Sequence, residues 1–480
     1  MRNRRDHPGH WMSMPRLLLR TRRARRAADA GAVLRAVARG ASTAVGGQVR
    51  GQRFLLLLDP ALAGRLLADL ASGTTKSPGL QRTRVLLGDG LLTSEGDAHR
   101  RARRLVAPAF SPRRLAAYTE GFSERTEVHV GHWSDGAVLE MRQQMARLTL
   151  DIVGSTLLGM DLRQDADDVR SALESALESF AGGAPALAFR RRGGPRLPGR
   201  QAAAAGTQPG DGRPGDGQRG EGRSGDGQRG EGQRGEGLRA RLDAIVAKII
   251  EARRGEPSAD RGDVVSALLA ATAGPDGLTP AEVHDHVITL IMAGHETTAN
   301  ALSWTLYLLS SHPEAEQALH AELARLEGRR PGFEDLARLT YTRAVITESM
   351  RLFPPAWILS RTLTADADFG GWHAPAGTLV AVSPLLLHHD ARWFPEPERF
   401  DPSRWIDGRR DAVPRHAYLP FGTGPRSCIG EQFAWAEATT ALAVICSRWT
   451  ARTVSGTMVT PQYRVTMRPS PGLPMQVTAR

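Results

Sequence analysis

One segment, residues 279–311, limits the fold more than any other feature of the 480-residue sequence. It opens with a capping box, from Thr279 to Glu282 with proline at the first helical position, and it ends before Pro313. Apolar residues recur on almost every helical face of it, which is typical of a helix that is buried on most sides. The segment therefore predicts a helix through the middle of a large domain, and the polar residues 294–298 at its centre need a chemical explanation.

Shorter segments around this helix predict a mainly α-helical fold with small β-sheets. Residues 27–40 indicate a helix, and 43–50 and 52–58 indicate two strands separated by a glycine. Asp59, followed by proline, is a helix start, and helical periodicity dominates the next hundred or so residues. Residues 238–254 form a further amphipathic pattern with a helical period.

Two segments do not fit a packed core. Residues 1–26 are strongly basic and hold most of the excess behind the net charge of +12. Residues 201–237 contain glycine-rich repeats, such as GDGQRGEG at 215–222, that have no apolar side chain to offset the entropy lost on ordering. We expect a flexible basic arm, a single domain over 27–480 and a disordered insertion within that domain.

The composition excludes several classes of protein. Two cysteines are too few for a disulfide scaffold or a zinc site of several thiolates. No window reaches the ~18 consecutive apolar residues of a membrane span, and Leu17–Leu19 is too short for the apolar core of a signal peptide. The arm invites contact with nucleic acid or anionic lipid, but a solvated tail is the simpler interpretation. We expect a cytoplasmic protein without a nucleic-acid partner or a transmembrane segment.

Cys428 lies in an unusual local sequence. Gly424 and Pro425 disfavour regular structure before it, and a helix pattern begins just after Gly430. Free backbone N–H groups and the helix dipole at such an N-terminus favour a thiolate over a thiol. Cys446, by contrast, lies among apolar residues of that helix, as an ordinary buried cysteine does.

The segment Phe421-x-x-Gly424-x-Arg426-x-Cys428-x-Gly430 resembles the haem-binding signature of the cytochrome P-450 haem-thiolate monooxygenases at every defining position. The resemblance implies that Cys428 is the metal ligand, bound axially to the iron of haem b. It also implies that the two glycines let the backbone approach the macrocycle. Phe421 would pack beside the sulfur, and Arg426 would pair with a haem propionate.

A second match is Glu348-x-x-Arg351 on a predicted helix. Residues three apart share a helix face and can pair, but the spacing alone is common and would indicate a surface ion pair. The resemblance adds Arg404 as a third member. It implies a structural network inside the protein that fixes the loop holding Cys428.

The polar centre of the long helix is similar to the dioxygen-activating site of the same family. By that resemblance Gly294 leaves room over the iron, while Glu296 and Thr297 relay protons to dioxygen without flooding the pocket. Ala293 and Thr298 would line the substrate pocket. Without the resemblance, the run would be a polar patch satisfied by a neighbouring helix.

Further cofactor and substrate positions follow in the family's order. His99 and Arg103, four residues apart on a helix pattern, resemble propionate ligands. Arg361 and His388 occupy comparable places, although His389 matches the second equally well. Three residues after the Glu-x-x-Arg helix are expected to line the substrate pocket: Ala356, Trp357 and Ile358.

The resemblance covers most of the chain, from about residue 33 to the C-terminus. It implies a triangular helical domain around a buried haem, and a monooxygenase that inserts one atom of dioxygen into a hydrophobic small molecule. The sequence is most similar in style to bacterial members that oxidise terpenoids, with fatty acids as the next substrate class. The alternative is an inactive haem-binding protein or a peroxide-driven enzyme, against which Glu296 and Thr297 argue.

The sequence contains no flavin or iron–sulfur motif, so electrons are expected from a separate donor, a ferredoxin with its reductase or a flavoprotein. Arginines around the cysteine loop would suit an acidic partner, namely Arg103, Arg415 and Arg426. We expect the protein to be a monomer.

Overall fold

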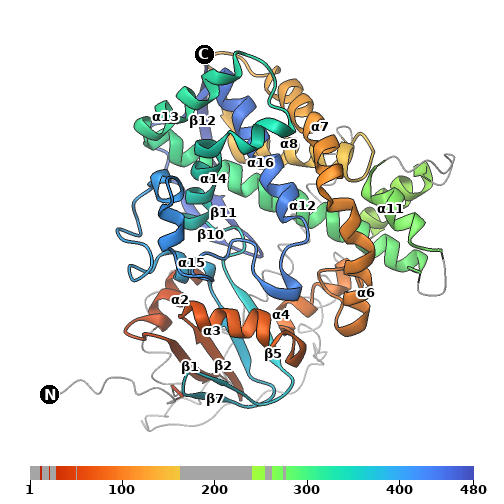
Figure 1. The fold of residues 1–480 in the computed structure, drawn as a ribbon, viewed down its shortest axis with the longest axis vertical. Coiled ribbons are helices and arrows are strands. Elements are labelled where there is room, and N and C mark those ends of the chain that lie inside the picture. The colour runs from red at the N-terminus through yellow and green to blue at the C-terminus, as the bar shows by residue number, and fades with distance from the viewer. Residues whose placement is uncertain are drawn as a thin grey trace, which may run out of the picture.

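The computed structural model describes residues 11–12, 21, 29–49, 51–162, 240–253, 262–273 and 277–480. Helices dominate the described chain, and the largest sheet lies at the end opposite to α13 and α7 (Figure 1). This is the mainly α architecture that the sequence predicts. The predicted insertion at 201–237 lies outside the described residues, as does nearly all of the predicted arm at 1–26.

The long central helix is α12 (Pro280–Ser311), where the sequence predicts it. Its capping box is formed: the Thr279 hydroxyl accepts from the Glu282 N–H at 3.2 Å, and the Glu282 carboxylate accepts from the Thr279 N–H at 2.8 Å. Most residues of α12 are buried, and many of its apolar side chains belong to the largest hydrophobic cluster. The helices around it are α6 (Gly96–Val106), α7 (Pro112–Val130), α8 (Met141–Thr156), α11 (Val264–Ala270), α13 (Pro313–Leu323), α14 (Thr340–Leu352) and α16 (Glu431–Arg448), and residues 240–253 are also helical.

The largest sheet has the strand order β1-β2-β8-β5-β3. Its strands are β1 (Ala44–Val49), β2 (Gln52–Leu57), β3 (Thr74–Lys76), β5 (Leu359–Leu363) and β8 (Leu379–Val382). In β2, Phe54 and Leu56 join the apolar cluster of α2 (Ala30–Ala38). Leu55 and Leu57 point to the other face and join the cluster of α3 (Pro60–Gly64). Successive side chains of a strand point to opposite faces of the sheet. A strand that packs against an apolar cluster on each face therefore needs consecutive apolar residues, as β2 has.

Three smaller sheets complete the strand inventory of the described chain. β4 (Val138–Glu140), β12 (Pro474–Ala479) and β9 (Trp449–Thr453) form one sheet, β10 (Thr460–Tyr463) pairs with β11 (Met467–Ser470), and β6 (Ala367–Phe369) pairs with β7 (Trp372–Ala374). The sequence predicted β1 and β2 but none of the other strands. These have three to six residues, too few for an alternating pattern to stand out.

Short helical segments connect the main elements. They are the π-helical turn η1 (Arg65–Asp69), η2 (Ala71–Gly73), α4 (Pro78–Gln81), α5 (Arg84–Leu87), η3 (Ala107–Phe110), η4 (Ala324–Leu326), η5 (Phe333–Ala337), α15 (Pro384–His388), η6 (Pro402–Trp405), η7 (Arg409–Ala412) and η8 (Gly424–Arg426). η8 precedes Cys428 and packs against η1. η1 and η8, which are far apart in sequence, therefore lie together beside the segment that carries Cys428.

Candidate active site

The middle of α12 has one accessible face in an otherwise buried helix. Ala293 is exposed, and Gly294, Glu296 and Thr297 are half-buried, whereas His295 and residues 286–292 are buried. Accessible surface at the centre of a buried helix indicates that this face borders an internal space. Glu296 and Thr297 thus lie with Ala293 on one face of the helix, whereas Gly294 lies at its edge, towards α8.

Thr149 of α8 holds this turn from the opposite side. Its hydroxyl donates to the His295 carbonyl at 2.9 Å, and the Thr297 hydroxyl donates to the Ala293 carbonyl at 2.8 Å. A Cβ on Gly294 would come within 3.1 Å of Val153, a tight contact, so glycine also lets α8 approach α12 here. The two contacts with α8 fix the accessible face relative to the rest of the core, and the Thr297 hydrogen bond stays within α12.

A tight loop presents Cys428 at the start of α16. The Cys428 N–H donates to the Phe421 carbonyl at 2.9 Å. Gly424 has φ of 76°, and a Cβ there would lie 2.3 Å from the Leu67 carbonyl of η1, so this position requires glycine. Gly430 has an ordinary φ and only van der Waals contact for a Cβ at 3.7 Å. Protein packing therefore explains the glycine at 424 but not the one at 430.

Cys428 is accessible, whereas Cys446 is buried inside α16. Burial raises the pKa of Cys428 to about 11, against the opposing effects of the Gly430 N–H and the Arg103 charge. The helix N-terminus acts in the direction that the sequence indicates, but desolvation is the larger effect. An accessible yet desolvated thiol borders an internal space, and a nearby cation is needed to hold it as thiolate.

A cluster of basic side chains lies beside the cysteine loop. Arg103 donates to the Ser427 carbonyl at 2.7 Å, and Arg426 donates to the Ser94 carbonyl at 2.9 Å and pairs with Glu95. Lys76 Nζ also donates to the Ser94 carbonyl, at 2.8 Å. Four basic side chains and one histidine form this cationic cluster, and they come from four separate segments: Lys76, His99, Arg103, Arg361 and Arg426.

These cations repel one another in a desolvated place. Burial, and then the charge of Arg426, lowers the pKa of Lys76 to about 7 and that of Arg361 to about 10. The same two causes lower the pKa of His99 to about 3, so its imidazole is neutral. Lys76 and Arg361 are direct partners in the β3–β5 register, an unfavourable pairing for like charges. Glu95 offsets this repulsion only in part, so the cluster is suited to an anionic ligand.

Lys76 was not found from the sequence. The segment Thr-Thr-Lys has no pattern that marks a buried lysine, and its neighbours come from α6, β5 and η8. Only the pairing of β3 with β5 would have indicated that Lys76 belongs to the cationic cluster.

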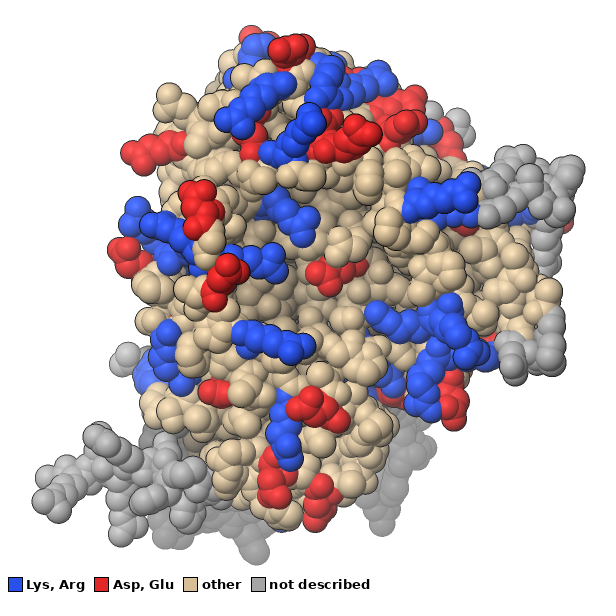
Figure 2. Space-filling view, viewed as in Figure 1, with Lys and Arg blue, Asp and Glu red and all other residues tan. Residues whose placement is uncertain are grey.

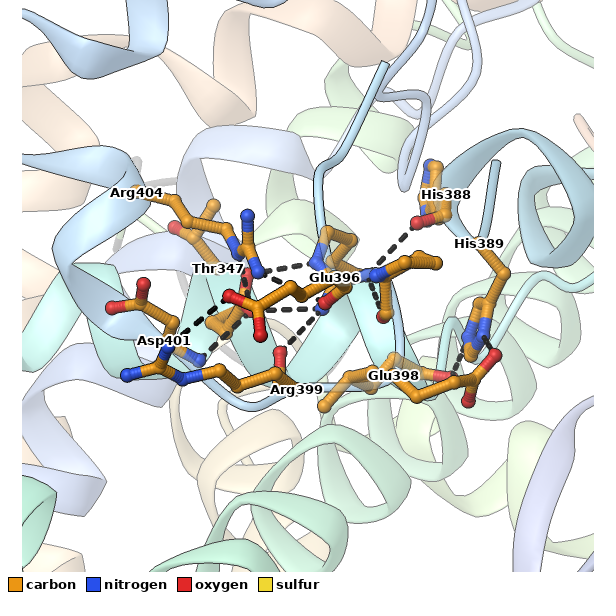
Figure 3. Close-up of polar contacts among 12 residues, drawn as sticks. Thr347, His388, His389, Glu396, Glu398, Arg399, Asp401 and Arg404 are labelled. Atoms are coloured by element: carbon orange, nitrogen blue, oxygen red, sulfur yellow. Dashed lines mark hydrogen bonds and ion pairs between the residues drawn. The ribbon is translucent and has the colours of Figure 1, made fainter. Parts of the chain in front are cut away.

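Glu348, Arg351 and Arg404 come together, as the sequence predicts. Glu348 and Arg351 form a fully buried ion pair at 2.8 Å, and Arg404 Nε lies 3.3 Å from Glu348. The Trp405 indole N–H also donates to Glu348, at 2.8 Å. Arg351 donates to three backbone carbonyls: His388, Pro397 and Arg399. Figure 3 shows Arg404 and Asp401 on one side of this cluster and His388 and His389 on the other.

His388 and His389 contact this network rather than the cationic cluster. His388 is fully buried, its Nε2 accepts from the Leu419 N–H at 2.9 Å, and burial lowers its pKa to about 3. His389 contacts Glu398 at 3.0 Å and the Leu352 carbonyl at 2.9 Å. The structure thus brings His99, Arg103, Arg361 and Arg426 to one place, but neither His388 nor His389 joins them.

The residues expected to line the substrate pocket divide into two groups. Ala293, Ala356 and Ile358 have accessible surface. Trp357 is 2% exposed, packs with α2 in a hydrophobic cluster, and donates to the Arg464 carbonyl at 2.9 Å. Thr298 is buried and faces Glu437 of α16. The structure therefore gives Trp357 and Thr298 packing contacts within the core.

Glu437 is a buried carboxyl group that the sequence analysis did not single out. It is fully buried, and neither carboxyl oxygen has a hydrogen-bond partner of good geometry among the described residues. Burial raises its pKa to about 8, an effect that Thr298 offsets only in part. Glu437 is therefore largely protonated at neutral pH.

Comparisons with known proteins identify the family. A model described as Cytochrome P450 matches residues 32–181 and 231–476. The chain belongs to the cytochrome P450 family. The match leaves out 182–230, which overlaps the predicted insertion.

Curated relatives and a solved structure agree with this assignment. A cyclooctatin synthase of Streptomyces melanosporofaciens is 36% identical, over 86% of this chain and 83% of the relative. A pentalenene oxygenase of Streptomyces avermitilis is 33% identical, over 83% and 82%. The heme domain of cytochrome P450DA is 25% identical with a TM-score of 0.76, and the alignment covers 91% of this chain and 90% of that one.

This P450 is thus an oxidoreductase, a haem-dependent monooxygenase of hydrophobic compounds, and its cofactor is haem b with a thiolate ligand. The residues present fit that group. The cationic cluster is suited to two propionates, the cysteine loop presents an accessible sulfur, and Gly430 is a glycine that protein packing does not require. No helix in the described ranges is long and apolar enough to cross a membrane.

Proposed function

We propose that this P450 hydroxylates a cyclic terpenoid, and that Cys428 would hold its haem through the thiolate sulfur. The observation that carries the assignment of the ligand is the cysteine loop itself: Cys428 is the accessible cysteine, and it lies beside the cationic cluster. Cys446 is enclosed in α16, where burial raises its pKa to about 12. It cannot reach a cofactor without unfolding the helix.

The propionates would be held by the cationic cluster. Lys76, Arg361 and Arg426 would supply positive charge, and His99, neutral in its buried place, would supply a hydrogen bond. Binding a dianion there removes the repulsion between Lys76 and Arg361. The haem supplies the activation of dioxygen when it is bound.

The accessible face of α12 would supply protons and exclude bulk water. Glu296 holds a carboxylate and Thr297 a hydroxyl on this face, and Gly294 keeps the backbone free of a side chain beside them. A carboxylate and a hydroxyl one residue apart can pass protons inward one at a time, which a water-filled pocket would not control.

The substrate class rests on the names of the relatives. A cyclooctat-9-en-7-ol 5-monooxygenase of Streptomyces melanosporofaciens is 38% identical over 78% of this chain, beside the cyclooctatin synthase and the pentalenene oxygenase. The apolar residues Ala293, Ala356 and Ile358 would suit a bulky hydrocarbon because they carry no charge. Linear fatty acids are the second class.

The electron donor would be a separate protein that docks on the face carrying α6 and α16. Figure 2 shows basic side chains over the region of α6 on this face. Arg103 and Arg426 are turned inward by their contacts, whereas Arg415 is exposed. Of the three arginines expected at the interface, Arg415 is therefore the one suited to meet an acidic partner.

Spectroscopy tests this function. The reduced protein with carbon monoxide should show the absorption of a thiolate-ligated haem, and Cys428→Ser should lose it while Cys446→Ser retains it. Cyclic terpene alcohols should shift the iron spin state at lower concentration than linear fatty acids of equal carbon number. A thiolate spectrum that survives in Cys428→Ser would overturn the ligand assignment, and tighter binding of fatty acids would overturn the substrate class.

A further inference from the structure

The β10–β11 turn contacts Glu296, an acidic residue at the centre of α12. The Thr466 hydroxyl donates to Glu296 Oε1 at 2.8 Å, and Asn300 Nδ2 donates to the same hydroxyl oxygen at 3.1 Å. Glu296 and Asn300 are four residues apart, so the Thr466 hydroxyl contacts side chains on two successive turns of α12. Thr466 is 170 residues from Glu296 in sequence, and no local pattern connects them.

These contacts have a defined direction. An amide nitrogen can only donate, so the Thr466 oxygen is an acceptor from Asn300 and its single proton is directed to Glu296. Oε1 of Glu296 therefore acts as an acceptor, the role of a carboxylate oxygen. Thr466 and Asn300 are buried, so water does not compete freely for either bond.

The turn itself is held in place on both sides of Thr466. The Trp357 indole N–H donates to the Arg464 carbonyl at 2.9 Å, and the Met467 N–H donates to the Pro355 carbonyl at 3.0 Å. Trp304 of α12 donates to the Met467 carbonyl at 3.4 Å. The hydroxyl of Thr466 is therefore presented from a fixed backbone rather than from a free loop.

We infer that Thr466 is a positioning residue that orients the Glu296 carboxylate on the accessible face of α12. The inference rests on the proton-relay role proposed above for Glu296. Thr466 would act through Glu296, and it links the relay to Trp357 and the β10–β11 hairpin. Buried Trp357 then has a role as a support of the hairpin that carries Thr466.

The test is a matched pair of variants in the haem-loaded enzyme. Thr466→Val keeps the shape of the side chain and removes the hydroxyl, whereas Thr466→Ser keeps the hydroxyl. We expect Thr466→Val to raise the share of electrons lost to peroxide about three- to tenfold, the effect of one hydrogen bond, and Thr466→Ser to restore the original share. Substrate affinity and the carbon monoxide spectrum should remain those of the original protein in both variants.

A crystal structure of Thr466→Val gives a readout independent of turnover, and we expect the Glu296 carboxylate to leave its place beside residue 466. Equal peroxide shares in Thr466→Val and the original protein, or equal losses in the Val and Ser variants, would overturn the inference. Glu296→Gln separates it from the function on which it rests. If Glu296→Gln raises the peroxide share but Thr466→Val does not, only the positioning role fails. If Glu296→Gln has no effect, the relay itself is wrong.

Discussion

At the residue scale, two ionisable groups are unfavourable where they stand, Lys76 in the cationic cluster and Glu437 in the core between α16 and α12. Lys76 and Glu437 are both buried, with the pKa of the lysine lowered and that of the carboxyl raised. Neither has a full set of opposite charges or hydrogen bonds to offset the loss of hydration. Such groups make the stability of the protein depend on pH and on what the site contains.

Lys76→Met should stabilise the haem-free protein and weaken its hold on haem. Lys76 has a pKa of about 7 when folded against 10.5 as a model group, so the unfolded chain binds more protons between these values and stability rises with pH across that window. The stabilisation by Lys76→Met should thus be greatest below pH 7 and should vanish towards pH 10.5. Haem transfer to an acceptor globin should be about three- to tenfold faster in the variant.

Chemical unfolding of the haem-free proteins at two pH values checks the first part, and Lys248→Met, at an exposed lysine, is the control. A variant that retains haem as firmly as the original protein would contradict the role of Lys76 in the cationic cluster.

Glu437→Gln should stabilise the protein, and more so as the pH rises. The carboxyl has a pKa of about 8 when folded against 4.5 as a model group, so the folded state holds an extra proton between these values and stability falls with rising pH. Glutamine has nearly the same shape and does not titrate. The difference in unfolding free energy should grow by up to about 1.4 kcal/mol per pH unit within that window. A difference independent of pH would show that Glu437 does not hold the proton.

At the scale of elements, the structure joins segments that the sequence keeps apart. Motifs made of consecutive residues, such as the cysteine loop and the Glu348–Arg351 pair, could be predicted because their spacing is local. Lys76 and Thr466 could not, because each acquires its neighbours only when β3 pairs with β5 or when the β10–β11 turn meets α12. His388 shows the same limit: its place in sequence order suggested the haem, but folding brings it to the Arg351 network.

Trp405→Phe should weaken the connection between α14 and η6. The variant removes the indole N–H that donates to buried Glu348 and leaves a carboxylate with one donor fewer. We expect a loss of about 1–3 kcal/mol in unfolding free energy, together with partial loss of the thiolate spectrum. Trp393→Phe is the matched control, because the Trp393 indole N–H has no hydrogen-bond partner among the described residues. Equal losses in both variants would mean that the hydrogen bond to Glu348 is unimportant.

At the scale of the whole molecule, the sequence predicted the fold class from a few features: the buried helix 279–311, the strand pair 43–58 and the helical periodicity of segments between them. The division into a domain with an inserted segment is still a prediction, because 201–237 lies outside the described residues. The interruption of the family match at 182–230 agrees with it.

Deleting residues 201–230 should leave the haem protein intact. Glycine-rich repeats without apolar side chains bury little on folding, and halving the length of a loop changes its closure free energy by only about 0.6 kcal/mol. The carbon monoxide spectrum and the unfolding midpoint of the deletion variant should match those of the full chain. Loss of soluble, haem-containing protein on deletion would show that this segment belongs to the domain.

The cationic cluster has a consequence for biosynthesis. Its members lie at positions 76, 99, 103, 361 and 426, and Cys428 follows them in the sequence. During translation, the ribosome must release nearly the entire polypeptide before a complete binding place for the porphyrin exists. Cofactor capture is therefore a late event, and a finished chain that lacks haem carries the unrelieved repulsion of two like charges on β3 and β5.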